Sequence, residues 1–175
     1  DQMEPEFPVL SAAAQEQLRS FVADGGALLI SGAYLAEDLA NGPLADDQSR
    51  MFLADVLKID NYRPDATGIN AVRFPEDFDS VASKDEEDEL ALIPFRFGRD
   101  LEAPINMMPS VYEVHSAEAL QGAGGMTPIL EYGDSGEAAG LLGSGVMVLG
   151  FPLETVLPVK ARTALLREGL TRLTR

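Results

Sequence analysis

Residues 10–39 constrain the fold more than any other stretch, because they combine a helix, its stop, an apolar strand and a second helix start. Ser11 predicts an N-cap at the beginning of the first helix. The apolar residues that follow recur at spacings of three and four, which predicts one buried helical face: Ala14, Leu18, Phe21 and Val22. Asp24-Gly25-Gly26 predicts the end of this helix, since glycine adopts the left-handed backbone conformation without a steric penalty.

Ala27–Ile30 is apolar at every position, which is typical of a strand covered on both faces. A helix, a tight turn and a buried strand in this order indicate a doubly wound α/β sheet, in which ligands gather at the carboxyl ends of the strands. The predicted site is therefore the segment from Ser31 to Tyr34. Tyr34 and Asp38 are one helical turn apart, so we expect them to share a face. Two interpretations follow: the pair lines a pocket at the strand end, or Tyr34 is a packing residue with its hydroxyl at the rim.

Composition narrows the classes of function. The length of 175 residues predicts a single domain over residues 1–175. The formal net charge of -16 argues against nucleic acid or an anionic membrane surface as the main partner. The absence of cysteine excludes disulfides, thiolate metal sites and a cysteine nucleophile. No apolar run approaches the roughly 20 residues of a membrane helix, so we expect no membrane insertion.

The second half of the chain predicts three short strands, over Thr127–Tyr132, Glu137–Leu142 and Val146–Phe151. Gly133-Asp134-Ser135-Gly136 and Gly143-Ser144-Gly145 are typical of the hairpin turns that join such strands. Pro158 fits the first turn of a final helix. The leucines of that helix predict one buried stripe: Leu165, Leu166, Leu170 and Leu173.

The middle of the chain is less regular. It predicts a helix from Asp46 or Asp47 to about Leu57, a polar loop over Tyr62–Gly68, and strands over Ile69–Phe74 and Leu90–Phe97. Carboxylates dominate residues 76–89, but Val81 replaces an EF-hand ligand and the central glycine is missing, so a solvated loop is the better interpretation. The glycines of 122–125 lack the Lys and Ser/Thr of a phosphate loop, which favours a connector. No cofactor is expected.

Two segments together resemble the class I glutamine amidotransferase-like domains. The first is LSAAAQEQLRSFVADGGALLISGAYLAEDL, and the second is AAGLLGSGVMVLGFPLETVLPVKARTALLREGLTRL. The resemblance implies a flavodoxin-like, three-layer αβα sandwich with a C-terminal antiparallel meander. The subset it most resembles consists of non-catalytic modules in larger secreted or cell-envelope proteins, some linked to polysaccharide processing. By resemblance, we therefore expect export, further domains or a second copy as partners, and a carbohydrate as a candidate ligand.

The chain departs from the catalytic pattern of this family. A working glutaminase needs a cysteine on an elbow after a central strand, and a His-x-Glu pair near the end of the domain. The elbow position falls at or beside Ala33, and Glu154 matches the carboxylate with no histidine two residues before it. The resemblance therefore implies an inactive module.

The resemblance also implies that strand-helix units are missing on the N-terminal side. The chain begins at Asp1 without an initiator Met or a signal-peptide pattern, which predicts a piece of a longer or processed protein. The strand at residues 27–30 would then expose a parallel edge, which an upstream segment or another chain would cover. Pairing through this edge, as an assembly module, is an alternative function.

A hydrolase is the other alternative. Ser31 would be the nucleophile, His115 the base and Asp38 or Glu154 the orienting carboxylate, or Asp38 and Glu154 would act as a carboxylate pair. The structural interpretations are that Ser31 satisfies backbone groups at its turn, that His115 is a hydrogen-bonded or surface residue, and that Glu154 fixes its own turn. A single histidine also provides no His-based metal site, so no metal is expected. If the fold is as predicted, Ser31 and Glu154 lie at the same end of the sheet.

Overall fold

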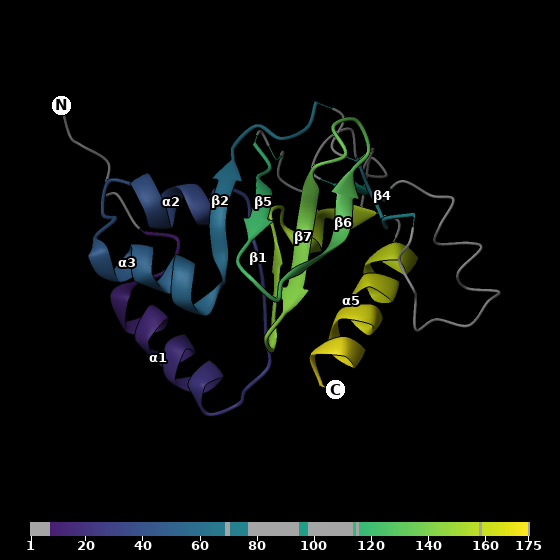
Figure 1. The fold of residues 1–175 in the computed structure, drawn as a ribbon. Helices are drawn as coiled ribbons and strands as arrows, with labels where there is room; N and C mark the ends of the chain where they lie inside the picture. Colours follow the sequence, from purple (N-terminus) through teal and green to yellow (C-terminus); the bar gives the residue numbers. More distant parts are fainter. Residues whose placement is uncertain are drawn as a thin grey trace, which may run out of the picture.

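The computed structural model describes residues 8–68, 71–76, 95–97, 114, 116–157 and 159–174, with 95–97 described as backbone (Figure 1). It is a mixed α/β structure, which confirms the predicted class. Several predictions lie outside the described residues: those for the acidic stretch beyond Glu76, for His115 and for Pro158.

Helix α1 (Ala12–Ala23) begins and ends as the sequence predicts. The Ser11 hydroxyl accepts a hydrogen bond from the Ala14 N–H at 3.3 Å, and Gly25 has a φ of 85° just beyond the helix. Leu18 and Val22 pack against the core, but Phe21 is 50% exposed, so its predicted burial is wrong. The Phe21 ring instead covers Gly26, where a Cβ would overlap it.

Strand β1 (Leu28–Ser31) pairs in parallel with β8 (Val146–Leu149). Alternate residues of both strands enter two different hydrophobic clusters: Leu28, Ile30, Val146 and Val148 face one, and Leu29, Met147 and Leu149 face the other. Both faces of the pair are therefore covered, which explains why both strands are apolar at nearly every position.

Among the described residues, seven strands form one sheet in the order β1-β8-β7-β6-β3-β4-β9. The remaining strands are β3 (Ala71–Arg73), β4 (Phe95–Phe97), β6 (Thr127–Tyr132), β7 (Ala138–Gly143) and β9 (Val156–Leu157). Within this described sheet only the β1/β8 pair is parallel. Short connections account for the antiparallel pairing of β6 with β7 and of β7 with β8. Ser144 and Gly145, with φ of 52° and 75°, form the two-residue turn between β7 and β8.

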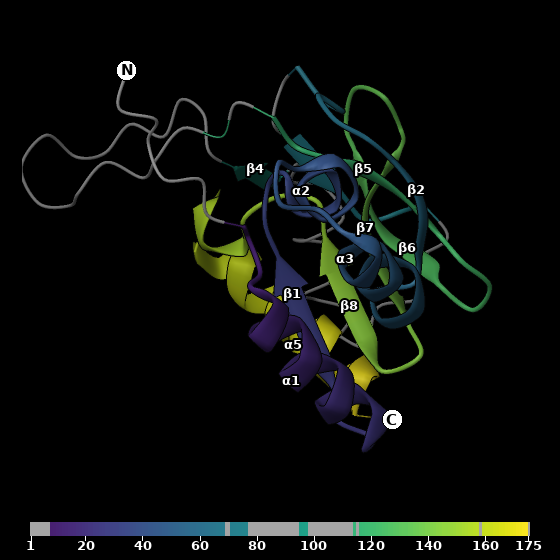
Figure 2. The same ribbon diagram turned by 90° about the vertical axis from the view of Figure 1, so that its left-hand side faces the viewer.

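Helices lie on both faces of this sheet (Figures 1 and 2). On one face α5 (Val159–Leu173) contacts β1, β7 and β8. On the other are α1, α2 (Leu35–Asn41), α3 (Asp47–Met51) and the π-helical turn η1 (Phe52–Val56). Apolar side chains of α1, α2 and η1 pack on β1 and β8, whereas α3 buries Ser49 and exposes Met51. The predicted stripe of α5 is wrong at one position: Leu165 is buried, but Leu170 is 52% exposed.

A second, two-stranded sheet joins β2 (Ile59–Arg63) and β5 (Ala119–Gly122). Tyr62 pairs with Leu120 and Arg63 with Ala119, so the predicted loop over Tyr62–Gly68 is wrong at its start. The partner strand is far away in the sequence, and the local pattern of β2 is mostly polar because most of its side chains are exposed. Both Tyr62 and Leu120 belong to the cluster under α2 and η1.

Candidate functional site at the carboxyl end of the parallel strands

The turn after β1 leads directly into α2. Gly32 donates a hydrogen bond to the Leu149 carbonyl at 3.3 Å, so the turn begins beside the end of β8. Tyr34, the N-cap of α2, has left-handed backbone angles (φ 62°, ψ 15°) and is 45% exposed. Such angles are uncommon outside glycine and mark a sharp strand-to-helix elbow. The left-handed residue is thus next to Ala33, the position that the resemblance marks.

The carboxylate of Glu118 lies against the first turn of α2, beside this elbow, and its exposed fraction is 0%. Its two oxygens accept hydrogen bonds from the backbone N–H groups of Ala36 at 2.9 Å and Glu37 at 2.7 Å. Amides in the first turn of a helix have no partner within the helix, and their dipoles favour a negative group. Glu118 thus occupies the donors that would otherwise be directed at a ligand.

The backbone of Glu118 is equally well anchored. Its N–H donates to the Gly150 carbonyl at 2.8 Å, and its carbonyl accepts from the buried Tyr132 hydroxyl at 2.8 Å. A Cβ at position 150 would overlap the Glu118 carbonyl oxygen, so only glycine allows this approach. Glu118 therefore links α2 with β6 and with the segment after β8.

Burial raises the pKa of Glu118 above its ordinary value, and the nearby Glu37 carboxylate adds to this effect. The hydrogen bonds from the backbone N–H groups of Ala36 and Glu37 act in the opposite direction. Burial also raises the pKa of the Tyr132 phenol, which therefore remains a hydrogen-bond donor. The site is thus a desolvated polar contact that joins α2, β6 and the segment after β8 through Glu118.

Ser31 uses its hydroxyl inside the fold. Its Oγ accepts a hydrogen bond from the Leu153 N–H at 3.3 Å, at the beginning of the short helix η2 (Leu153–Thr155). This contact confirms that Ser31 and Glu154 lie at the same end of the sheet. Glu154 is exposed, and its carbonyl accepts from the Arg162 guanidinium at 2.6 Å.

Asp38 connects α2 to the segment before α1, since its carboxylate accepts from the Val9 N–H at 2.8 Å. Because His115 is outside the described residues, its role as a base for Ser31 stays a prediction. The structure thus brings Ser31, Tyr34 and the Glu154 turn to one end of the sheet, and it engages Ser31 and Asp38 with backbone N–H groups.

A second polar cluster tethers α2 to β2. The Tyr62 hydroxyl donates to the Glu37 carboxylate at 2.6 Å and accepts from the Asn41 side-chain amide at 2.5 Å. Burial and the hydrogen bond to Glu37 raise the pKa of Tyr62 to about 12, so the phenol stays protonated. Sequence analysis missed both Glu118 and this cluster. The available signal for Glu118 was a lone acid between Ala117 and Ala119-Leu120.

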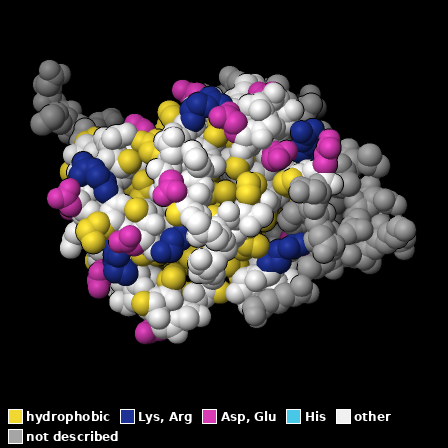
Figure 3. Space-filling model, viewed as in Figure 1, with side chains coloured by type: hydrophobic (Ala, Val, Ile, Leu, Met, Phe, Trp, Pro, Cys, Tyr) yellow, Lys and Arg dark blue, Asp and Glu magenta, His cyan; other side chains and the backbone are white. Residues whose placement is uncertain are grey.

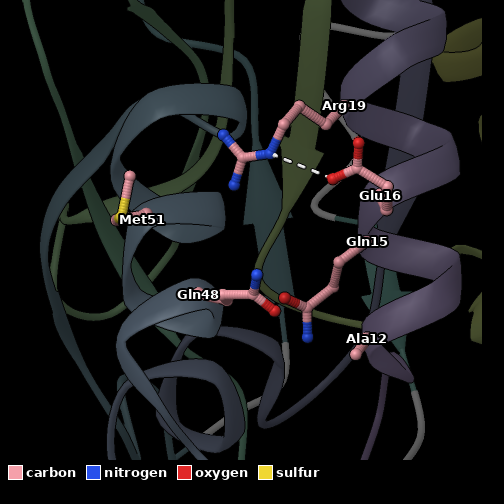
Figure 4. Close-up of a pocket in the computed structure, with 6 residues that line it drawn as sticks. All are labelled: Ala12, Gln15, Glu16, Arg19, Gln48 and Met51. Atoms are coloured by element: carbon pink, nitrogen blue, oxygen red, sulfur yellow. Dashed lines mark ion pairs between the residues drawn. The ribbon is translucent and has the colours of Figure 1, made fainter.

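A groove with a volume of about 270 Å³ runs between α1 and α3 (Figure 4). Gln15 and Gln48 point toward one another across it, and the Arg19 guanidinium faces Glu16, 3.9 Å away. Gln15 is buried and donates to the Leu10 carbonyl at 2.9 Å and to Ser49 at 3.4 Å. The Gln15–Ser49 hydrogen bond thus joins α1 to α3.

A second hollow of about 340 Å³ lies over the β2/β5 ribbon. Its lining includes Tyr62, Gln121 and the Arg63–Glu137 ion pair. Arg63 also donates to the carbonyls of Asp65 and Ala66, so its guanidinium is engaged by the protein. Neither hollow is lined by Ser31, Asp38 or Glu154.

Other functional features are sparse. The described residues contain no cluster of three or more His, Asp or Glu placed to bind a metal ion. Within the same residues no helix is long and apolar enough to cross a bilayer. Figure 3 shows acidic, basic and hydrophobic side chains interspersed over the described part of one face.

Comparison with known proteins yields no counterpart: no family model, no curated protein and no solved structure matches this chain. The geometry at the end of β1 and β8 is therefore the basis for assigning a function.

Proposed function

We propose that this chain is a catalytically inactive, glutamine amidotransferase-like module with a flavodoxin-like core, and that it serves as a scaffold or binding domain in a larger exported protein. The observation that carries the proposal is the position of Glu118. A buried carboxylate of the chain itself occupies the Ala36 and Glu37 amides at the elbow. An acyl-transfer enzyme needs such donors free for a developing oxyanion.

The state of Ser31 supports the same conclusion. The Ser31 Oγ accepts a hydrogen bond from the Leu153 N–H, so the hydroxyl has a structural role at its own turn. In the described part of the chain no buried side-chain nitrogen or oxygen lacks a hydrogen-bond partner. The polar groups around the elbow thus have structural partners, as expected of a scaffold.

Turnover assays test this proposal against the hydrolase alternative. We expect the purified protein to release no product from glutamine, simple esters or glycosides above the rate of a buffer blank. Ser31→Ala should leave this background unchanged. Turnover that is lost in Ser31→Ala, or in Glu154→Gln with Asp38→Asn as its pair, would establish a hydrolase and overturn the proposal.

The position of β1 favours an assembly role as a second candidate function. β1 is the terminal strand of the described sheet, with β8 as its one described strand neighbour, and Leu28–Ser31 contains no charge or proline to protect the edge. Exposed apolar side chains flank both ends of this strand. Phe21 covers Gly26 before it, Tyr34 follows it, and Leu170 is adjacent to Gly169, which faces Leu29.

The occupant that fits this edge is a second copy of the chain, paired antiparallel through β1. A two-fold axis through the middle of β1 would bring the Phe21 end of one copy to the Tyr34 end of the other. The apolar groups at opposite ends of the edge would then cover each other in both halves of the interface.

Sedimentation velocity over a range of concentrations tests this pairing. We expect a concentration-dependent dimer, with a dissociation constant that rises about tenfold or more in Phe21→Glu and in Leu170→Glu. Leu44→Glu is the matched control, since Leu44 is 53% exposed in the α2–α3 connection, and it should not alter association. A strict monomer at every concentration excludes this role.

A further inference from the structure

Helix α2 ends with Asn41, and Gly42 follows it. The Asn41 side-chain amide donates to the Tyr62 hydroxyl at 2.5 Å and lies 3.5 Å from the Glu37 carboxylate. The Tyr62 hydroxyl in turn donates to the same Glu37 oxygen at 2.6 Å. An asparagine that precedes glycine is therefore part of the contact that joins α2 to β2.

We propose that Asn41 is a site of spontaneous deamidation, and that the Tyr62–Glu37 pair restrains it. In this reaction the Gly42 backbone nitrogen attacks the Asn41 Cγ, and a five-membered succinimide forms. The Cγ–Nδ2 bond breaks, and ammonia leaves with the proton from the Gly42 N–H. Water then opens the ring at either carbonyl and produces aspartate or isoaspartate, so water is the only co-reactant.

The fold requires a glycine at the reacting position. A Cβ at residue 42 would overlap the Asp38 carbonyl oxygen, so the attacking nitrogen cannot be shielded by a side chain of its own residue. The other asparagines are followed by larger residues: Asn61 by Tyr62, Asn70 by Ala71 and Asn106 by Met107. Asparagine is a chemically labile residue, and Asn41 is the one in this chain whose neighbour offers least steric protection.

Three hydrogen bonds oppose the reaction in the folded state. The Gly42 N–H donates to the Asp38 carbonyl at 3.0 Å, and this bond must open before the nitrogen can attack. The Asn41 amide must also leave the Tyr62 hydroxyl before its Cγ can turn toward Gly42. Its contact with the Glu37 carboxylate at 3.5 Å must open as well. Removing the phenol hydroxyl takes away the shorter of the two Asn41 contacts and leaves the helical bond in place.

The product would weaken the contact between α2 and β2. A carboxylate at position 41 has no hydrogen to donate to Tyr62, and it places a second negative charge one helical turn after Glu37. The modification would thus loosen the same helix whose first turn is capped by Glu118.

Peptide mass mapping after incubation of the folded protein at mildly alkaline pH tests this proposal. We expect a mass increase of one dalton at Asn41 ahead of the other asparagines, about fivefold faster in Tyr62→Phe, the factor that corresponds to one neutral hydrogen bond. Tyr34→Phe, which removes a phenol at the other end of α2, should leave the rate unchanged.

Circular dichroism of Tyr62→Phe must show a native fold at the incubation temperature, and Tyr62→Leu provides a second variant without the hydroxyl. Unchanged rates at Asn41 in both folded variants, or faster modification at another asparagine, would overturn the proposal. The proposed function does not depend on this result.

Discussion

Glu118→Ala is expected to lower the free energy of unfolding by about 3–5 kcal/mol, enough to unfold much of a marginally stable domain. The substitution removes the acceptor of two buried backbone N–H groups, those of Ala36 and Glu37. Each unsatisfied buried donor costs roughly 1–3 kcal/mol, and the cavity left by the side chain adds to this cost. Urea denaturation followed by circular dichroism measures the change.

Glu118→Gln separates the loss of the acceptor from the loss of charge. The glutamine oxygen can accept from one N–H, but its NH₂ group faces the other, so we expect an intermediate loss of unfolding free energy.

Burial raises the folded-state pKa of Glu118 above 4.5, so the native state binds more protons than the unfolded state in the window above that value. Stability from Glu118 is present below pH 4.5 and is lost as the pH rises through the raised pKa.

The free energy of unfolding of wild type should therefore rise relative to that of Glu118→Gln as the pH falls toward 4.5. Glu16→Ala is a control for removing an exposed carboxylate, and it should change stability by less than about 0.5 kcal/mol. A loss below about 1 kcal/mol in Glu118→Ala would show that water or a relaxed α2 replaces the carboxylate, and would contradict its proposed role.

Gly150→Ala is expected to destabilise the protein by about 3 kcal/mol or more, which is the upper range for overpacking a buried site. The added methyl group would overlap the Glu118 carbonyl oxygen, which is backbone and cannot rotate away. The Gly150 carbonyl also accepts the Glu118 N–H, so any shift of this segment disturbs the anchor of Glu118.

Gly124→Ala provides the matched comparison, because a Cβ at Gly124 meets no atom within 4 Å. We expect the unfolding free energy of Gly124→Ala to equal that of wild type within about 0.5 kcal/mol. Thermal melts of the two variants, recorded side by side, measure the difference. Equal melting temperatures would mean that the approach of Gly150 to Glu118 relaxes without cost.

Elements with a strong local signal could be predicted from the sequence. Helix α1 has both a capping serine and a glycine stop, and the run of apolar residues in β1 reflects helices on both faces of the sheet. The turn between β7 and β8 follows from glycine next to a small polar residue. Local chemistry determines these features, so a single sequence shows them.

Features that depend on distant partners could not be predicted. Glu118 and Ala36 are 82 positions apart, and nothing near either residue shows that they meet. The polar pattern of β2 conceals a strand, because its pairing with β5 becomes visible only in three dimensions. Phe21 and Leu170 match the apolar period of their helices, but they remain half-exposed.

The candidate site also has one part that the sequence predicts and one part that it does not. The strand end at Ser31 could be located from the order of helix, stop and strand, and the Ser31 hydroxyl does contact the turn that contains Glu154. The contact of Glu118 with the first turn of α2 could not be predicted, because Glu118 comes from a segment with no catalytic motif of its own. The sequence pattern around Ser31 thus locates the site, whereas the chemistry of the site depends on Glu118, which the pattern does not show.

The pairing of β1 with β8 has a consequence for the order of folding. Leu28 lies opposite Val146, so the one parallel contact of the described sheet closes a loop that contains most of the chain. During synthesis α1 and β1 leave the ribosome well before β8, their sheet partner. The β6–β7–β8 hairpins need only local contacts and can form quickly once they emerge. We therefore expect α1 and β1 to dock onto β8 after these hairpins have formed, and until then β1 is open to pairing with other strands.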